Sequence, residues 1–332
     1  MGAKFFGASV LRKEDPRLLR GEGRFVDDIK LPGMLHAAFA RSPHAHARVL
    51  AVRTQAAAAL PGVAHVFAFA DLIRWMKPMP LFGATPPGLA ARVAVTMRQI
   101  PQLPMARDVV RYVGEIVAMV VADSRALAED AAELVEVDYE PLPPVTDMVQ
   151  AAEAGSPLVY PEWGDNVAVH FATGFGDVDA AWRAADVRVR ERFHIQRYVG
   201  MPIETRGVAA QWDVRDGTLT TWNGTQVVHF VQQGLVAALD LPAHKIRVIA
   251  PDVGGGFGTK ANGYPEDLLV PAAAIHCRRP VKWTEDRREH MMAPRWTALG
   301  LAVMVCPVFP RECTAMMTAR VDDVARSEAR SC

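Results

Sequence analysis

The sequence lacks a long apolar run and an excess of charge of either sign. No stretch of about 18 apolar residues occurs, so we expect no transmembrane helix. The 37 basic and 37 acidic residues balance, which gives no electrostatic reason to expect nucleic acid or an anionic membrane as a partner. The N-terminal sequence carries charges throughout and lacks the apolar centre of a secretory signal. We therefore expect a cytoplasmic protein.

Cysteine is also scarce through most of the chain. Cys277 is the only cysteine before residue 306, and Cys306, Cys313 and Cys332 follow it. This distribution excludes a disulfide scaffold for the body of the chain. It also has none of the cysteine spacing that holds an iron–sulfur cluster.

The first region with a regular pattern, residues 20–145, is typical of an α/β domain. Apolar runs predict strands over residues 34–40, in the second half of residues 109–121, and over residues 135–140. The proline-rich residues 76–106 predict a long loop. The region is long enough to bury a core of its own.

A helix is expected between the last two of these strands. Ser124 is a suitable N-cap. The expected buried face consists of Leu127, Ala131, Leu134 and Val135.

A linker and a second region follow. Prolines open an irregular stretch that predicts a linker over residues 146–164. The second region, residues 165–291, begins with a short helix capped by Asp177. Apolar residues then alternate with polar ones over residues 187–195, which predicts a half-buried strand.

The next segments predict a hairpin, a helix and a strand. Residues 208–212 and 219–222 flank a turn that contains Gly217. A strand is expected over residues 245–250. The helix between them has apolar residues four positions apart, at Val227, Val231, Leu235 and Leu239. These patterns together predict a mixed α+β fold.

A glycine-rich segment, Val253–Lys260, follows the last strand and precedes an expected helix. Its glycines at 254, 255, 256 and 258 allow unusual backbone angles and leave amides open to an anionic oxygen. A Walker A loop is excluded because Thr259 precedes Lys260 and Ala261 follows it. The glycine spacing also differs from the dinucleotide-binding fingerprint. A plain tight turn is the alternative.

Several segments, in this order and spacing, carry a resemblance to a known family. They are Gly23–Val49, Val110–Val145, Met201–Asp213, Thr218–Lys260 and Arg279–His290. Together they resemble the large subunits of molybdenum hydroxylases, the xanthine dehydrogenase, aldehyde oxidase and carbon monoxide dehydrogenase family, and most closely its carbon monoxide dehydrogenase-like branch. The resemblance implies that residues 20–145 form an α/β hammerhead domain and that residues 165–291 form the first part of a molybdopterin-binding domain.

The resemblance also implies a cofactor site. In the family, the glutamine that matches Gln226 lies near an oxygen ligand of molybdenum, and the glycine loop supplies backbone amides beside the metal's ligands. The implied cofactor-binding residues are therefore Gln226, Gly255, Gly256, Phe257 and Gly258. Molybdenum is held through the pterin, so no residue is expected to ligate it directly.

The family's chemistry implies the remaining expectations about function. The cofactor is expected to be molybdopterin in its cytosine dinucleotide form, with molybdenum. An iron–sulfur small subunit and a FAD-binding medium subunit are the implied partners. The implied reaction hydroxylates an aldehyde, an N-heterocycle or carbon monoxide with water-derived oxygen.

Other polar residues are expected to be structural. Glu204 and Arg206 match a family segment near the cofactor, but a carboxylate beside an arginine favours an ion pair over a catalytic base. The segment from Trp283 to Glu289 reads as a charged structural stretch after a strand. The histidines of the first domain, at 36, 44 and 46, read as surface or packing residues rather than metal ligands.

The sequence departs from the family in three respects. Ala261 stands where the xanthine dehydrogenase branch commonly has glutamate, which disfavours a purine hydroxylase. The family subunit is more than twice as long, so its catalytic glutamate is expected in a missing C-terminal half and no catalytic residue is assignable. Residues 1–19 read as an N-terminal extension, and residues 292–332 depart from the family pattern.

These departures lead to two hypotheses. The tail is interpreted as the product of a shifted reading frame, with no packing partner for its apolar residues 299–308; a divergent C-terminal element is the alternative. The chain is then expected to be a truncated cofactor-binding subunit that is inactive alone. The alternative function is a non-catalytic fragment whose hammerhead domain only folds or binds partner subunits.

Overall fold

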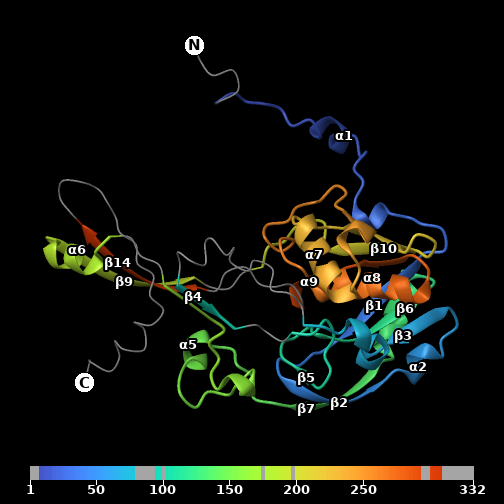
Figure 1. The fold of residues 1–332 in the computed structure, drawn as a ribbon, viewed down its shortest axis with the longest axis horizontal. Helices are drawn as coiled ribbons and strands as arrows, with labels where there is room; N and C mark the ends of the chain where they lie inside the picture. The colour runs from blue at the N-terminus through green and yellow to red at the C-terminus, as the bar shows by residue number, and fades with distance from the viewer. Residues whose placement is uncertain are drawn as a thin grey trace.

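The computed structural model describes residues 7–78, 94–98, 102–172, 176–195, 199–292 and 300–308. Its centre is a seven-stranded mixed sheet with the order β12-β11-β10-β13-β1-β6-β3 (Figure 1). The strands are β1 (Leu35–Arg41), β3 (Val63–Phe67), β6 (Ile116–Ala122), β10 (Gly207–Asp213), β11 (Thr218–Asn223), β12 (Ile246–Ile249) and β13 (Val281–Thr284). The predicted strands at 34–40, in the second half of 109–121 and at 245–250 are confirmed, as is the hairpin of β10 and β11.

The sheet joins the two regions that the sequence separates. β13 pairs parallel with β1, with Leu35 opposite Val281, and antiparallel with β10, with Val208 opposite Trp283. The expectation that the first region buries a core of its own is confirmed for small clusters such as that of Ala38, Ala122 and Ala128, but another cluster that its central strands contact also includes residues of the second region. The physical reason is that β13 is buried, so its backbone groups need partners along both edges.

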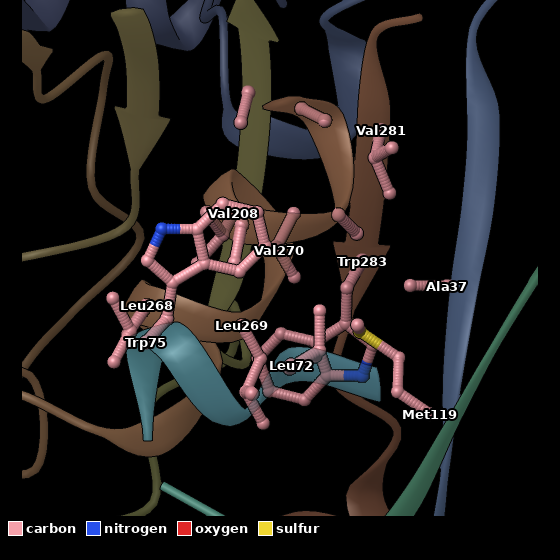
Figure 2. Packing of buried hydrophobic residues seen from close by; sticks show 14 of the residues in the cluster. Ala37, Leu72, Trp75, Met119, Val208, Leu268, Leu269, Val270, Val281 and Trp283 are labelled. Carbon is pink, nitrogen blue, oxygen red and sulfur yellow. The ribbon is translucent and has the colours of Figure 1, made fainter. Parts of the chain in front are cut away.

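One hydrophobic cluster accordingly draws on both regions. Figure 2 shows Trp75 and Met119 from the first region in the same cluster as Leu268, Leu269 and Trp283 from the second. Trp75 is the last residue of the 3-10 helix η2 (Phe69–Trp75). The two leucines belong to helix α8 (Pro265–Cys277), which is the helix expected after the glycine loop.

The second helix beside the sheet, α7 (Val228–Leu239), confirms its predicted apolar face. Val231, Leu235 and Leu239 are buried, whereas Val227 is the N-cap rather than a helical residue.

A smaller sheet, in the order β5-β2-β7, completes the first region. It contains β2 (Ala47–Arg53), β5 (Val109–Val110) and β7 (Glu136–Pro141), and the short helix α2 (Gln55–Ala58) follows β2.

Helix α4 (Arg125–Glu133) starts as predicted, because the Ser124 hydroxyl accepts a hydrogen bond from the Leu127 amide. The prediction that Leu134 is buried is wrong, since it is 40% exposed. The helix ends before this residue. Ala131 of the predicted face is fully buried, and so is Ala128, which was not predicted.

The predicted long loop and linker both contain regular structure. Strand β4 (Ala94–Met97) lies inside the expected loop and pairs with β8 (Val169–Ala172); residues 79–93 and 99–101 lie outside the described residues. The expected linker contains a helical turn, α5 (Met148–Ala151), and the 3-10 turn η3 (Pro161–Trp163).

A two-stranded ribbon lies apart from the central sheet in Figure 1. It follows α6 (Val178–Ala184), whose predicted cap is confirmed because Asp177 accepts from the Ala180 amide. Strand β9 (Val187–Ile195) is also confirmed. It pairs along its whole length with β14 (Gly300–Val308), so the expectation of no packing partner is wrong for residues 300–308, whereas Leu299 lies outside the described residues. A lone strand leaves its backbone N–H and C=O groups without partners, and β14 supplies partners to β9.

The other short helical elements among the described residues are α1 (Asp15–Leu19), η1 (Val26–Asp28), η4 (Ala243–Lys245) and α9 (Arg287–Met292). No helix among the described residues is long and apolar enough to cross a membrane. Residues 309–332 of the tail lie outside the described residues.

The shared core leads to a prediction about cooperativity. Leu269→Ala should cost about 2–5 kcal/mol of unfolding free energy, because the side chain is fully buried. Amide exchange in β6 and in β10 should rise together in this variant, since both strands border the same cluster. Leu134→Ala is the control and should cost under about 1 kcal/mol. Chemical denaturation and hydrogen exchange test this; faster exchange in β10 alone would contradict a shared core.

Candidate cofactor-binding site

The glycine loop lies between β12 and α8 and has an unusual backbone. Gly255, Phe257 and Gly258 have φ angles of 97°, 49° and 87°. A positive φ suits glycine but strains Phe257, whose side chain is 69% exposed. The turn is closed by hydrogen bonds to the Gly256 and Gly258 carbonyls, donated by the Thr259 and Ala261 amides. The backbone of the loop is thus a tight turn, the conformation that the sequence analysis weighed against an anion-binding loop; the turn alone does not exclude binding.

The turn leaves several backbone N–H groups without a hydrogen-bond acceptor among the described residues. Within the described part of the chain, the amides of Gly255, Gly256, Phe257 and Gly258 donate to no protein acceptor. The loop combines a tight turn with available N–H groups, a backbone arrangement that suits an anionic oxygen.

Gln226 lies directly against this loop. A Cβ atom on residue 256 would stand 2.2 Å from Gln226 Oε1, so only glycine leaves room for the glutamine side chain. The Gln226 amide donates to the Lys260 carbonyl at 2.9 Å, and the Thr225 hydroxyl donates to the same carbonyl at 3.2 Å. Among the described residues, no group hydrogen-bonds to the exposed Gln226 carboxamide. The structure therefore brings together the residues that the resemblance selects.

A segment of residues 200–206 supports the loop from another side. A Cβ on Gly254 would lie 2.6 Å from the Glu204 Cβ, and one on Gly255 would lie 3.2 Å from the Pro202 Cβ. A Cβ on Gly200 would lie 2.9 Å from the Phe257 carbonyl oxygen. The loop is therefore packed between Gln226 and residues 200–206.

Glu204 forms an ion pair, as expected, but with a different partner. Its Oε2 accepts from Lys260 Nζ at 2.7 Å and from the Gly254 amide at 2.7 Å. Lys260 is 1% exposed, and burial lowers the pKa of its ammonium group although the Glu204 charge opposes that shift. The pairing ties the start of the glycine loop to its end.

Arg206 pairs instead with Glu266 and Glu285. Its guanidinium nitrogens lie 3.1 Å and 2.6 Å from oxygens of these carboxylates, and its Cζ lies 3.9 Å from the centre of the Tyr264 ring. Arg41 of β1 also binds Glu266, at 2.7 Å. The buried pairs therefore connect the first region to the segment that supports the loop.

Burial favours the neutral form of Glu285, but the Arg206 charge and hydrogen bonds from His290 and Arg206 outweigh it and lower the pKa of this carboxyl to about 2. His290 joins the network through both ring nitrogens. Nδ1 lies 2.8 Å from Glu285 Oε2, and Nε2 lies 2.9 Å from the Gly200 carbonyl oxygen. The ring therefore links Glu285 to the backbone at Gly200.

This network was not predicted from the sequence. Its members lie on β1, just before β10, on α8 and in the segment around α9, and charged residues so far apart give no sequence signal of their pairing. The interpretation of Trp283–Glu289 as a charged structural segment agrees with the position of Glu285.

The histidines of the first region have packing roles, as expected. The His44 ring lies 4.8 Å from the Tyr139 ring, and His46 Nδ1 lies 2.9 Å from the Pro143 carbonyl oxygen. His36 is partly buried, which lowers its pKa. A search of the described residues finds no group of three or more histidine, cysteine, aspartate or glutamate side chains that could hold a metal ion.

Two protein-family models match successive segments of the chain. Residues 20–143 match the hammerhead domain of aldehyde oxidase and xanthine dehydrogenase, and residues 159–296 match the molybdopterin cofactor-binding domain. The chain belongs to the xanthine dehydrogenase and carbon monoxide dehydrogenase family of molybdopterin-binding large subunits. It is thus a member of an oxidoreductase family, with a hammerhead domain followed by part of a cofactor-binding domain.

Individual family members agree. The chain is 41% identical over 288 residues to the nicotine 6-hydroxylase large subunit of Paenarthrobacter nicotinovorans. This match covers 86% of the chain and 34% of that protein. It is 40% identical over 298 residues to the carbon monoxide dehydrogenase large chain of Afipia carboxidovorans, covering 86% and 35%. The chain therefore spans about a third of the length of these relatives.

Solved structures give the same result. The quinoline 2-oxidoreductase of Pseudomonas putida 86 aligns with a TM-score of 0.80 and 38% identity, over 91% of this chain and 37% of that one. Carbon monoxide dehydrogenase of Oligotropha carboxidovorans aligns with a TM-score of 0.78 and 36% identity, over 91% and 37%.

The contact between Gln226 and Gly256 can be tested without a cofactor. Gly256→Ala should fold, because a flexible side chain can move away from the new methyl group, but it should displace the Gln226 carboxamide. Gly258→Ala should instead lose about 1–2 kcal/mol of stability from its positive φ angle and leave Gln226 in place. The NMR resonances of the Gln226 side-chain amide measure the displacement. An unshifted amide in Gly256→Ala would disprove the contact.

The buried network makes a prediction about stability and pH. Glu285→Gln should cost about 3–5 kcal/mol, because it leaves Arg206 short of a buried counter-charge. Since the folded-state pKa of Glu285 is about 2, its contribution is present above its ordinary pKa of 4.5 and is lost as pH falls toward about 2. Unfolding at pH 7 and pH 3 measures both effects. Asp138→Asn, which cuts an exposed pair with Arg53, should change little; an equal loss in both variants would contradict the prediction.

Proposed function

We propose that the chain forms one side of a molybdenum–pterin site, in which Gln226 and the amides of Gly255, Gly256, Phe257 and Gly258 contact the cofactor. The observation that carries this proposal is the position of the Gln226 carboxamide against Gly256, in a loop where the amides of residues 255–258 have no acceptor among the described residues.

The residues present fit such a group. A side-chain amide can donate to an oxygen on a metal without competing as a ligand. A metal held by a pterin dithiolene needs no protein cysteine or histidine, which agrees with the donor set around the loop. The glycine loop would present N–H groups at a place where a side chain on residue 256 would collide with Gln226.

When bound, the cofactor supplies the redox centre for hydroxylation of a substrate carbon with water-derived oxygen. This chain would hold the cofactor in place and orient its oxygen ligands by hydrogen bonds from Gln226 and the loop. We propose the cytosine dinucleotide form of molybdopterin. Electrons would leave to an iron–sulfur small subunit and a FAD-binding medium subunit, since the chain has no cysteine spacing for a cluster. The names of two relatives, a "large subunit" and a "large chain", support such an assembly.

The proposed substrate is an aldehyde, an N-heterocycle or carbon monoxide. Relatives named for nicotine, quinoline and carbon monoxide support the last two classes about equally. Ala261 in place of the glutamate common in the xanthine dehydrogenase branch disfavours a purine.

We further propose that these 332 residues are inactive by themselves. Hydroxylation needs a base to activate the attacking oxygen. Glu204 is a carboxylate beside the loop, but it already accepts hydrogen bonds from Lys260 and Gly254. The competing hypothesis is a non-catalytic fragment whose hammerhead domain folds or binds partner subunits without holding a cofactor.

The experiment is to express the chain in a host that makes the cofactor and to measure pterin by fluorescence and molybdenum by mass spectrometry. We expect substoichiometric molybdenum and no dye-linked oxidation of aldehydes or heterocycles. Gln226→Ala should lower the bound cofactor about tenfold or more, as expected for loss of a hydrogen bond to a charged group. Gln211→Ala, at an exposed position of β10, is the matched control and should bind as the parent does. Equal binding by parent and Gln226→Ala would reject the site, and turnover by the parent would reject its inactivity.

A further inference from the structure

We infer that Glu204 is a positioning residue, which clamps the two ends of the glycine loop and so fixes the amides that face the cofactor. The inference rests on the proposed function for its consequence, but its geometry is independent of any cofactor. It is carried by one carboxylate oxygen that receives hydrogen bonds from both ends of the loop.

The clamp has two arms. Glu204 Oε2 accepts from the Gly254 amide, at the start of the loop, and from Lys260 Nζ, at its end, each at 2.7 Å. In the other direction, the Glu204 amide donates to the Gly254 carbonyl at 3.2 Å. The residues between these ends are therefore held as a closed turn rather than as a free glycine segment.

The sequence of the loop is adapted to this carboxylate. Gly254 does not have a positive φ, so its backbone does not require glycine. It requires glycine for space, because a Cβ there would stand 2.6 Å from the Glu204 Cβ. Gly254 thus admits Glu204 in the same way that Gly256 admits Gln226.

The clamp itself is anchored from behind. Arg287 Nη2 donates to the carbonyls of Pro202 and Ile203, each at 2.9 Å, and His290 donates to the Gly200 carbonyl at 2.9 Å. The Ile203 side chain is 95% exposed, so these polar contacts rather than apolar packing of that residue fix the backbone before Glu204. Two residues after Glu204, Arg206 joins this segment to the buried carboxylates of Glu266 and Glu285.

The charge of the ion pair makes the clamp specific for a carboxylate. Lys260 is buried beside Glu204, and without a counter-charge its ammonium group would be strongly disfavoured there. Glu204→Gln would keep an acceptor for the Gly254 amide but would leave Lys260 without a counter-charge. Replacing Lys260 with an apolar residue of similar length in the same chain would remove that cost.

The test is hydrogen–deuterium exchange of the 332-residue chain, followed at the amides of Gly254, Thr259, Ala261 and Gln226, which are hydrogen-bonded in the closed loop. Glu204→Gln should raise their exchange rates at least tenfold and leave those of β11 unchanged. The double variant Glu204→Gln/Lys260→Met lacks the same arm without leaving an unpaired charge, so its rates should stay more than about threefold above those of the parent. Asp252→Asn, which cuts the nearby pair with Arg17 outside the clamp, is the matched control.

Each outcome decides the inference. Unchanged loop exchange in Glu204→Gln overturns it, and so does a double variant that returns to the parent rates, since that would attribute the faster exchange to the unpaired Lys260 charge rather than to the lost clamp. If Glu204→Gln does not fold, Lys260→Met cuts the same pair from the other side and must accelerate the same amides. Bound pterin measured in parallel separates the two proposals: a parent chain that binds none rejects the proposed function, while the exchange rates still decide the clamp.

Discussion

The buried charge of Arg206 is the constraint on which the rest of the structure depends. A guanidinium taken out of water is tolerated only with carboxylates around it, and here these come from α8 and from the segment after β13. Glu266 in turn binds Arg41 of β1. Because each group needs the others, the hammerhead strands, the helix after the glycine loop and the segment under the loop have one mutual arrangement.

The cofactor-binding loop inherits its position from that arrangement. Hydrogen bonds to His290 and Arg287 hold the backbone of residues 200–206, which ends at Arg206. The glycine loop packs against this segment at Gly200, Pro202 and Glu204. Gln226 closes the other side. Glycine therefore has two uses in this loop: at 255 and 258 it permits a left-handed backbone, and at 254 and 256 it makes room for a neighbouring side chain.

The division into domains looks different in sequence and in space. The two family models match separate segments of the chain, with residues 144–158 between them. The central sheet and its core nevertheless run across both, because β13 returns from the second segment to pair with β1. A hammerhead domain without this strand would leave the buried edge of β1 without its hydrogen-bond partners.

The sequence by itself determined what depends on local periodicity and on short-range chemistry. The amphipathic spacing of α7, the caps at Ser124 and Asp177, the β10–β11 hairpin and the glycine loop are all readable from neighbours along the chain. The tertiary structure alone decided what depends on distant residues meeting. It placed Leu134 outside the helix it was expected to join, paired Glu204 with Lys260 rather than Arg206, and gave residues 300–308 a partner in β9. The physical reason is that burial and ion pairing are set by which segments pack together, and no window along the chain contains that information.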